Sequence, residues 1–182
     1  MKKRIGFIST RFAGTDGVTL EASKWASILK AQSHECFWFA GVSDRNSRRS
    51  MVIPEAHFQH EQNRWINERI MGRKNRLPEV TDAIHEMRAF LKHRLREFLQ
   101  VFEIELLIVE NALAIPMHLP LGLAITEVIA ETRIPTIAHH HDFYWERTLI
   151  QYRTRGHQYP GPGRTRPPQG AVLNCYPQCA RL

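Results

Sequence analysis

Three consecutive histidines and an aspartate, His139, His140, His141 and Asp142, come directly after the apolar run of residues 134–138. Imidazoles and a carboxylate can bind a metal, hydrogen-bond a polar ligand such as a sugar, or simply form a polar turn. Side chains alternate in direction along an extended chain, so His139 and His141 would point to one side and His140 to the other. These two histidines are the first candidate site.

The use of these histidines stays open among three interpretations. A metal would gather His139 and His141, with Asp142 as a third ligand. No other histidine, cysteine or carboxylate is spaced as in a known zinc motif such as HExxH, so we expect neither a metal nor a cofactor. Hydrogen bonding of a histidine to a polar ligand is favoured over metal binding. A structural histidine, and an Asp142 that caps a following helix, are the simpler alternatives.

A glycine-containing loop near the start of the chain is the second candidate. "TRFAGTDG" holds Gly14, Asp16 and Gly17, and a helical pattern begins at Gly17. Glycine lets the backbone approach a ligand closely, and free N–H groups at a helix start favour phosphate or hydroxyl oxygens. The loop is neither GxGxxG nor a P-loop. A tight turn capped by Asp16 explains it equally well.

Glu110 and Asn111 form the third candidate. They end the apolar run of residues 104–109, which has the composition of a buried strand. Their polar groups would therefore emerge at the rim of a sheet. Ligand contact and hydrogen bonding within the loop are both consistent with this position.

The elements that must position these residues alternate between two periods. Short apolar runs predict strands at residues 4–9, 34–41, 104–110 and 134–139. We expect the first, third and fourth of these strands to be buried. Helical spacing predicts helices from Gly17, over 78–102 and from Pro120. Each helix has an apolar stripe that we expect to face the sheet. The stripes are Val18, Ala22, Trp25 and Leu29 in the first helix; Ile84, Met87, Leu91, Leu95, Phe98 and Phe102 in the second; and Leu121, Ile125, Val128 and Thr132 in the third. Residues 42–77 give weaker patterns, with a short strand at 51–54 and a helix within about 55–71.

This order of elements predicts an α/β fold: a single Rossmann-like domain whose open, mostly parallel sheet has helices on both faces. In such folds ligands bind beyond the carboxyl ends of the strands. All three polar stretches follow predicted strands, so we expect them to meet at one edge of the sheet although they are far apart in sequence.

The composition limits the alternatives. The chain has 182 residues, which suits one domain, and a formal net charge of +7. Residues 148–182 hold five arginines and no acidic residue, which leaves +2 for residues 1–147. The fold itself is therefore nearly neutral, and we expect no nucleic acid as a partner. No apolar run has the length of a membrane span or a secretory signal, so we predict a cytoplasmic protein.

The carboxy-terminal residues differ in kind from the rest. Residues 148–182 are rich in proline, glycine and arginine and lack helical or strand periodicity. We predict that they form an irregular or disordered tail after a domain of residues 1–147. Two of the three cysteines, Cys175 and Cys179, lie in this tail, and such a pair without other ligands is weak evidence for zinc.

Three stretches resemble a known family: "RIGFISTRFAGTDGVTLEASKWASIL", "IVENALAIPMHLPLGLAITEVI" and, above all, "IPTIAHHHDFYWER". They are similar to the amino-terminal domain of GT-B glycosyltransferases of the retaining family-four type. The likeness covers about residues 3–147. It implies two Rossmann-like domains that face each other across a cleft. The first domain holds the acceptor, and the second binds the nucleotide-sugar donor and carries an acidic E-x7-E motif. The sugar transfer in this family usually requires no metal.

The resemblance also implies roles for the candidate residues. Gly14, Asp16 and Gly17 would line the loop over the reacting sugar and phosphates. His141 and Asp142 best match the family's His-Asp pair that approaches the donor sugar, and we take them as the catalytic candidates, with His139 and His140 as alternates. Glu110 and Asn111 would lie on the acceptor side.

The expected departure from the family comes after residue 147, where the tail of residues 148–182 holds no E-x7-E motif and a second Rossmann-like domain is missing. We therefore expect a truncated glycosyltransferase that has little or no activity alone. We also expect an exposed apolar surface, which would favour self-association or the binding of a complementary donor-binding domain. The alternatives are a non-catalytic saccharide- or small-ligand-binding α/β module and, less favoured, a polyanion-binding protein that uses the arginine-rich tail.

Overall fold

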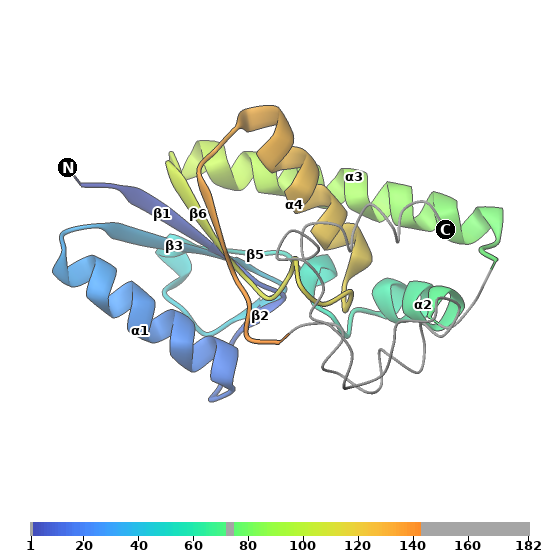
Figure 1. Ribbon diagram of the computed structural model, residues 1–182, viewed down its shortest axis with the longest axis horizontal. Helices are drawn as coiled ribbons and strands as arrows, with labels where there is room; N and C mark the ends of the chain where they lie inside the picture. Colours follow the sequence, from blue (N-terminus) through green and yellow to red (C-terminus); the bar gives the residue numbers. More distant parts are fainter. Residues whose placement is uncertain (1, 72–74, 143–182) are drawn as a thin grey trace, which may run out of the picture.

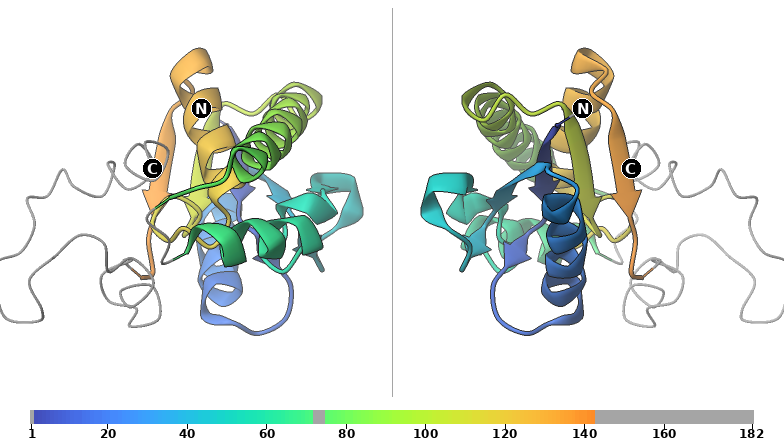
Figure 2. Two further views of the ribbon diagram at one scale, coloured as in Figure 1. Left: turned by 90° about the vertical axis from the view of Figure 1, so that its right-hand side faces the viewer. Right: turned by 90° about the vertical axis from the view of Figure 1, so that its left-hand side faces the viewer.

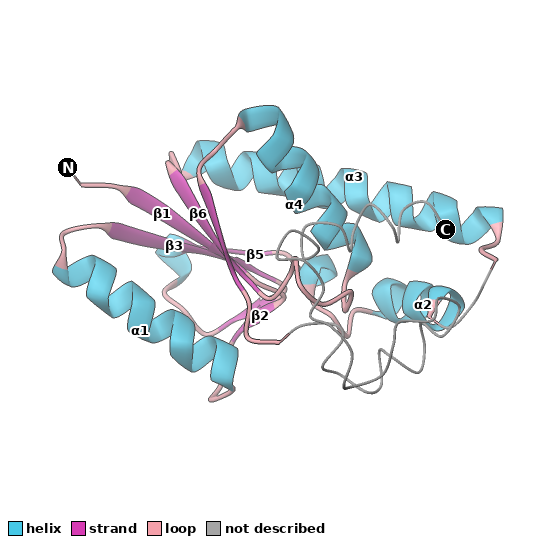
Figure 3. Cartoon of the chain, viewed as in Figure 1, coloured by secondary structure: helices cyan, strands magenta, loops and turns pink. Residues whose placement is uncertain are grey.

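A five-stranded parallel sheet forms the centre of the computed structural model, which describes residues 2–71 and 75–142 (Figures 1 and 3). The strand order is β5-β3-β1-β6-β7, and every neighbouring pair is parallel. The strands are β1 (Arg4–Ile8), β3 (Glu35–Ala40), β5 (Ser50–Val52), β6 (Leu106–Glu110) and β7 (Thr136–His139). A small second sheet pairs β2 (Arg11–Phe12) with β4 (Val42–Ser43). The predicted α/β, Rossmann-like fold class is confirmed.

Helices cover both faces of the sheet, as Figure 2 shows in two views. Helix α1 (Gly17–Ala31) lies on one face. Helices α3 (Pro78–Val101) and α4 (Leu119–Thr132) lie together on the other, and α2 (Glu61–Ile70) packs beside α3. Two 3-10 turns, Ser47–Arg49 and Pro54–Ala56, connect the elements between β4 and α2. None of the helices in the described part of the chain has the length and apolar character to cross a membrane.

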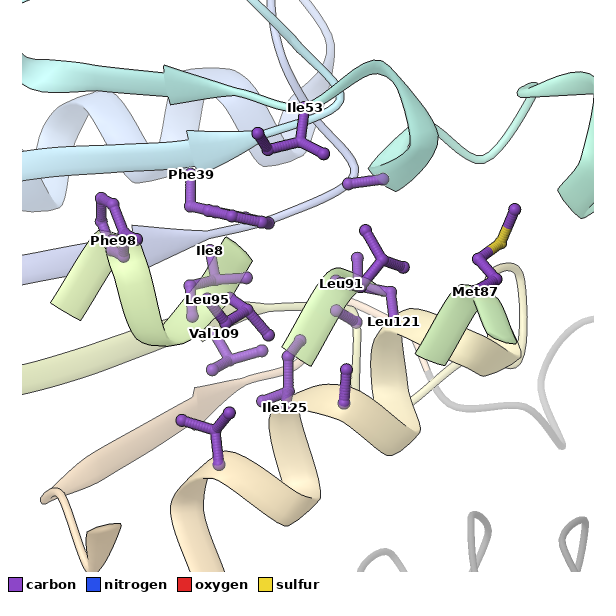
Figure 4. Packing of buried hydrophobic residues seen from close by; sticks show 14 of the residues in the cluster. Ile8, Phe39, Ile53, Met87, Leu91, Leu95, Phe98, Val109, Leu121 and Ile125 are labelled. Carbon is purple, nitrogen blue, oxygen red and sulfur yellow. The ribbon is translucent and has the colours of Figure 1, made fainter. Parts of the chain in front are cut away.

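Alternation along the strands divides the core into two clusters. In β3, Phe37 and Phe39 face α3 and α4, whereas Cys36 and Trp38 face α1. The larger cluster combines the inner faces of α3 and α4 with the sheet; Figure 4 shows part of it, including Ile8, Phe39, Leu91, Leu95, Phe98, Val109, Leu121 and Ile125. Gly6 in β1 leaves room for the Phe98 ring, since an added Cβ would lie 2.8 Å from it.

The predicted helical stripes are largely the ones that pack. Ile84, Met87, Leu91, Leu95 and Phe98 are buried in α3, and Leu121, Ile125 and Val128 are buried in α4. Thr132 is exposed, so its assignment to the inner face was wrong; it lies in the last turn, beyond the core. The weak helix within 55–71 is shorter than expected, because Pro54–Ala56 forms a separate 3-10 turn and α2 begins at Glu61.

The last strand corrects a second expectation. Strand β7 was predicted to be buried, but within the described residues it is the edge strand of the sheet, and Ile137 is 42% exposed. Apolar composition did not distinguish this edge position, in which β7 pairs with β6 on one side, from an interior position in the sheet. The helix expected from Phe143, the tail with Cys175 and Cys179, and the boundary at residue 147 all lie outside the described residues.

Gly41 offers a test of the packing at the end of β3. An added Cβ there would lie 2.1 Å from the backbone nitrogen of His57, so the Gly41→Ala substitution must move the backbone. We expect it to lower the free energy of unfolding by on the order of 3 kcal/mol, measured by urea denaturation. Gly17→Ala is the matched control, because open space surrounds Gly17. Equal stability of the two variants would contradict this account.

Candidate functional site

A cavity of about 360 Å³ lies at the carboxyl ends of β1 and β6. Its walls come from all three polar stretches predicted to meet: Asp16 and Gly17 from the first, Glu110 and Asn111 from the second, His141 and Asp142 from the third. The prediction of a shared edge is thus confirmed in its geometry. Gly14, His139 and His140 are not among the residues that line the cavity.

Asp16 acts as the N-cap of α1. Its carboxylate accepts hydrogen bonds from the backbone N–H (3.2 Å) and the hydroxyl (2.7 Å) of Thr19, and it pairs with Arg11 at 3.0 Å. Burial works to raise the pKa of the Asp16 carboxyl, but the hydrogen bonds from Thr19 and the charge of Arg11 outweigh it, so this pKa lies below its usual value. Asp16 is therefore ionised and fixed in place at the cavity wall.

Gly14 shapes the loop before this cap. Its φ of 81° lies in the left-handed region that favours glycine, and its backbone N–H donates to Asp44 Oδ2 at 2.9 Å. This N–H is therefore engaged within the protein. Its contribution to the cavity is the conformation of the loop that carries Asp16 and Gly17.

A buried carboxylate joins the second and third stretches. Glu110 is 0% exposed, and its Oε2 lies 2.9 Å from His141 Nε2 and 2.9 Å from His139 Nδ1. The rings of His139 and His141 are 4.5 Å apart, which agrees with the prediction that they point to one side. The sequence analysis did not identify Glu110 as the partner of the histidines, because it grouped Asp142 with them instead. The signal that finds it is the register, in which Glu110 pairs with His139 in adjacent parallel strands.

Asn111 holds the chain after β7 in position. Its backbone N–H donates to the His139 carbonyl at 2.9 Å, and its Oδ1 accepts from the backbone N–H groups of His141 (2.8 Å) and Asp142 (3.4 Å). Its φ is 57°, in the left-handed region that asparagine tolerates better than most residues. Of the two uses predicted for Asn111, the structure shows hydrogen bonding to the loop.

Arg11, Phe58 and His118 are among the cavity residues that the sequence analysis did not single out. Arg11 lies in the quoted glycine loop, and its guanidinium is 5.9 Å from the centre of the Phe58 ring. His118 precedes the proline that marks α4, which is a signal for an N-cap. Phe58 comes from the weakly patterned segment between β5 and α2, so no local signal placed it here.

His118 is a buried helix cap. Its Nδ1 accepts from the Leu121 N–H at 3.2 Å, so its Nε2 carries the proton and donates to the Glu55 carbonyl at 2.7 Å. Burial lowers the pKa of this imidazole to about 4, against the weaker opposing effect of the Glu55 carbonyl. Protonation would place a second N–H against the Leu121 N–H, so the native cap requires the neutral ring.

These features together define a cavity whose wall carries charged side chains of both signs among apolar ones. The chain is similar in sequence to two mannosylglucosylglycerate synthases. The Petrotoga mobilis protein is 25% identical over 150 residues, covering 82% of this chain and 34% of that protein. The Thermotoga maritima protein is 29% identical over 147 residues, covering 79% and 33%. The chain thus spans about a third of the length of the curated relatives it matches.

The other comparisons add no functional information. No protein-family model matches the chain. The zinc-inhibited form of teicoplanin deacetylase Orf2 aligns over 86% of this chain and 73% of its own, with a TM-score of 0.44 and 10% identity. A likeness at that level supports no inference about this protein.

Removing the Asn111 side chain tests whether its hydrogen bonds hold the backbone after β7 in place. We expect Asn111→Ala to lower the free energy of unfolding by about 1–3 kcal/mol, because two backbone N–H groups lose their acceptor and alanine is strained at positive φ. Urea denaturation measures the loss. Asn111→Asp keeps an acceptor oxygen and should recover most of the stability. An Asp variant as unstable as the Ala variant would argue against this role of the Asn111 hydrogen bonds.

The His118 cap predicts a pH dependence of stability. The pKa is depressed in the folded state, so the contribution of His118 is fully present above about pH 6.5 and declines as the pH falls towards 4. We expect the free energy of unfolding to be lower by on the order of 2–3 kcal/mol at pH 4.5 than at pH 7 because of His118. His118→Asn keeps a capping acceptor but cannot titrate. Urea midpoints of this variant should fall less over that range, and parallel curves would refute the assignment.

Proposed function

We propose that the described residues form the acceptor-side domain of a glycosyltransferase that moves a sugar from a nucleotide-sugar donor to an acceptor. The observation that carries the proposal is the convergence of three distant polar stretches on one cavity at the carboxyl edge of the sheet. The similarity to two synthases named for a product with mannosyl and glucosyl units supports it. The resemblance to the GT-B, retaining family-four group gives the two-domain arrangement.

Within this proposal, His141 and Asp142 contact the donor sugar at the mouth of the cavity. Both line it, and Asn111 fixes the backbone that carries them. Glu110 Oε2 accepts a hydrogen bond from His141 Nε2, which sets the tautomer and the angle of the ring. The alternates are His139, whose Nδ1 lies 2.9 Å from the same carboxylate oxygen, and His140, which follows it. Rigid placement of this kind is what positions a reacting sugar.

The start of α1 forms another part of the cavity wall. Asp16, Gly17 and Arg11 line it, and free N–H groups at a helix start favour phosphate or hydroxyl oxygens. Arg11 is the one arginine or lysine among the described lining residues, and it is already paired with Asp16. One engaged cation is a weak clamp for a departing nucleoside diphosphate. We therefore propose that a second domain supplies the donor site and that this domain alone transfers sugar slowly or not at all.

A transfer assay with added donor-binding domain tests the proposal. The chain is mixed with the carboxy-terminal domain of one of the two synthases and a panel of nucleotide sugars, and product is measured by mass spectrometry. We expect transfer with both parts and none with either part alone. His141→Ala should lower the rate by about 100-fold, because the sugar loses a positioning contact.

The control is Lys24→Ala, on the exposed face of α1, which should leave the rate unchanged. Saccharide binding that is never accompanied by transfer, with any donor domain, would favour a non-catalytic binding module instead. Loss of transfer in the His141 variant with unchanged circular dichroism separates a site effect from misfolding.

A further inference from the structure

We propose that Glu110, His139 and His141 bind a divalent transition-metal ion, with Zn²⁺ as the reference ion. One potential ligand atom from each side chain lies within 4.8 Å of the other two, and this is the set in the described residues that could hold a metal. Two imidazoles and one carboxylate are the ligands of many catalytic zinc and non-haem iron sites. The proposal concerns metal binding and does not depend on sugar transfer.

The distances are close to those of a coordinated ion. With metal–ligand bonds of about 2.0–2.1 Å, ligand atoms lie about 2.9 Å apart at right angles and about 3.3 Å apart in a tetrahedron. Glu110 Oε2 lies 2.9 Å from His139 Nδ1 and 2.9 Å from His141 Nε2. Small rotations of two imidazoles would therefore admit the ion without movement of β6 or β7.

Two potential ligand atoms of the cluster have no hydrogen-bond partner among the described residues. Glu110 is 0% exposed, and its Oε1 has no hydrogen-bond partner among the described residues. His139 Nδ1, although near Glu110 Oε2, is not aligned for a hydrogen bond and has no other such partner in the described part of the chain. A buried carboxylate and a buried ring nitrogen left in this state cost free energy, which a cation bound between them would recover.

The surroundings hold the ligands and leave one side open. The Trp25 ring of α1 stacks on His139 at 4.7 Å, and Asn111 fixes the backbone of His141. Glu110 and His141 also line the cavity, whereas His139 does not. The ion would therefore sit at the cavity wall, with its remaining coordination position towards the cavity and available to water or to a ligand oxygen.

A metal titration tests the site directly. The full chain is used with Cys175→Ser and Cys179→Ser, because these two thiols could bind zinc by themselves. Zn²⁺ is titrated calorimetrically, and Co²⁺ is followed by its visible absorption. We expect one ion per chain. Mg²⁺, which prefers oxygen ligands, should not compete.

Single substitutions assign the ligands. His139→Ala, His141→Ala and Glu110→Gln should each weaken binding by at least about tenfold, the lower end of the loss seen for outer-shell residues. His140→Ala is the matched control, since His140 lies between the two ligands and outside the cluster, and it should keep the affinity. Co²⁺ should also quench the fluorescence of Trp25, which stacks on His139, and the quenching should be smaller in Trp25→Phe, where the three other tryptophans remain.

Each result decides for or against the site. One ion lost in the three ligand variants and kept in His140→Ala supports it. No stoichiometric binding, or binding that survives all three variants, overturns it. If Glu110→Gln fails to fold, the two histidine variants still decide, as does the rise in melting temperature that Zn²⁺ must cause in the parent protein if it binds the folded state. None of these readouts requires sugar transfer, so the two proposals fail separately.

Discussion

A carboxylate buried at the end of an interior strand sets the constraint on which the site depends. Glu110 is fully buried, and an isolated charge there would be costly unless neighbouring groups compensate it. The compensation comes from the edge strand β7, whose register places His139 beside Glu110 and brings His141 within 2.9 Å of it. The pairing of β6 with β7 therefore serves the polar cluster as much as the core.

Asn111 holds this arrangement in place through hydrogen bonds to the backbone after β6 and β7. Beyond Glu110 the chain turns through a positive φ, and the same residue binds the backbone on both sides of His140. The histidines are thus held by the backbone as well as by their rings. A candidate site at the end of an exposed edge strand would otherwise be free to shift, since β7 has one neighbouring strand in the described sheet.

The parallel sheet explains why the cavity lies where it does. All five strands point the same way, so their carboxyl ends and the loops that follow gather at one edge. The core on both faces is apolar, and the polar residues with unusual environments, Glu110, His118 and the capped Asp16, cluster at this edge. His118 and Asp16 are helix caps, which shows that residues lining the cavity also stabilise the elements around it.

The sequence by itself determined the fold class, the long helices and the convergence of the three polar stretches, because periodicity and the handedness of βαβ units are local or nearly universal properties. It also determined that His139 and His141 share a side. The pairing of Glu110 with those histidines, the edge position of β7 and the entry of Phe58 into the cavity were decided by the tertiary structure. Each depends on which strands become neighbours and in what register, and strand order is fixed by the packing of the whole sheet rather than by any residue's local sequence.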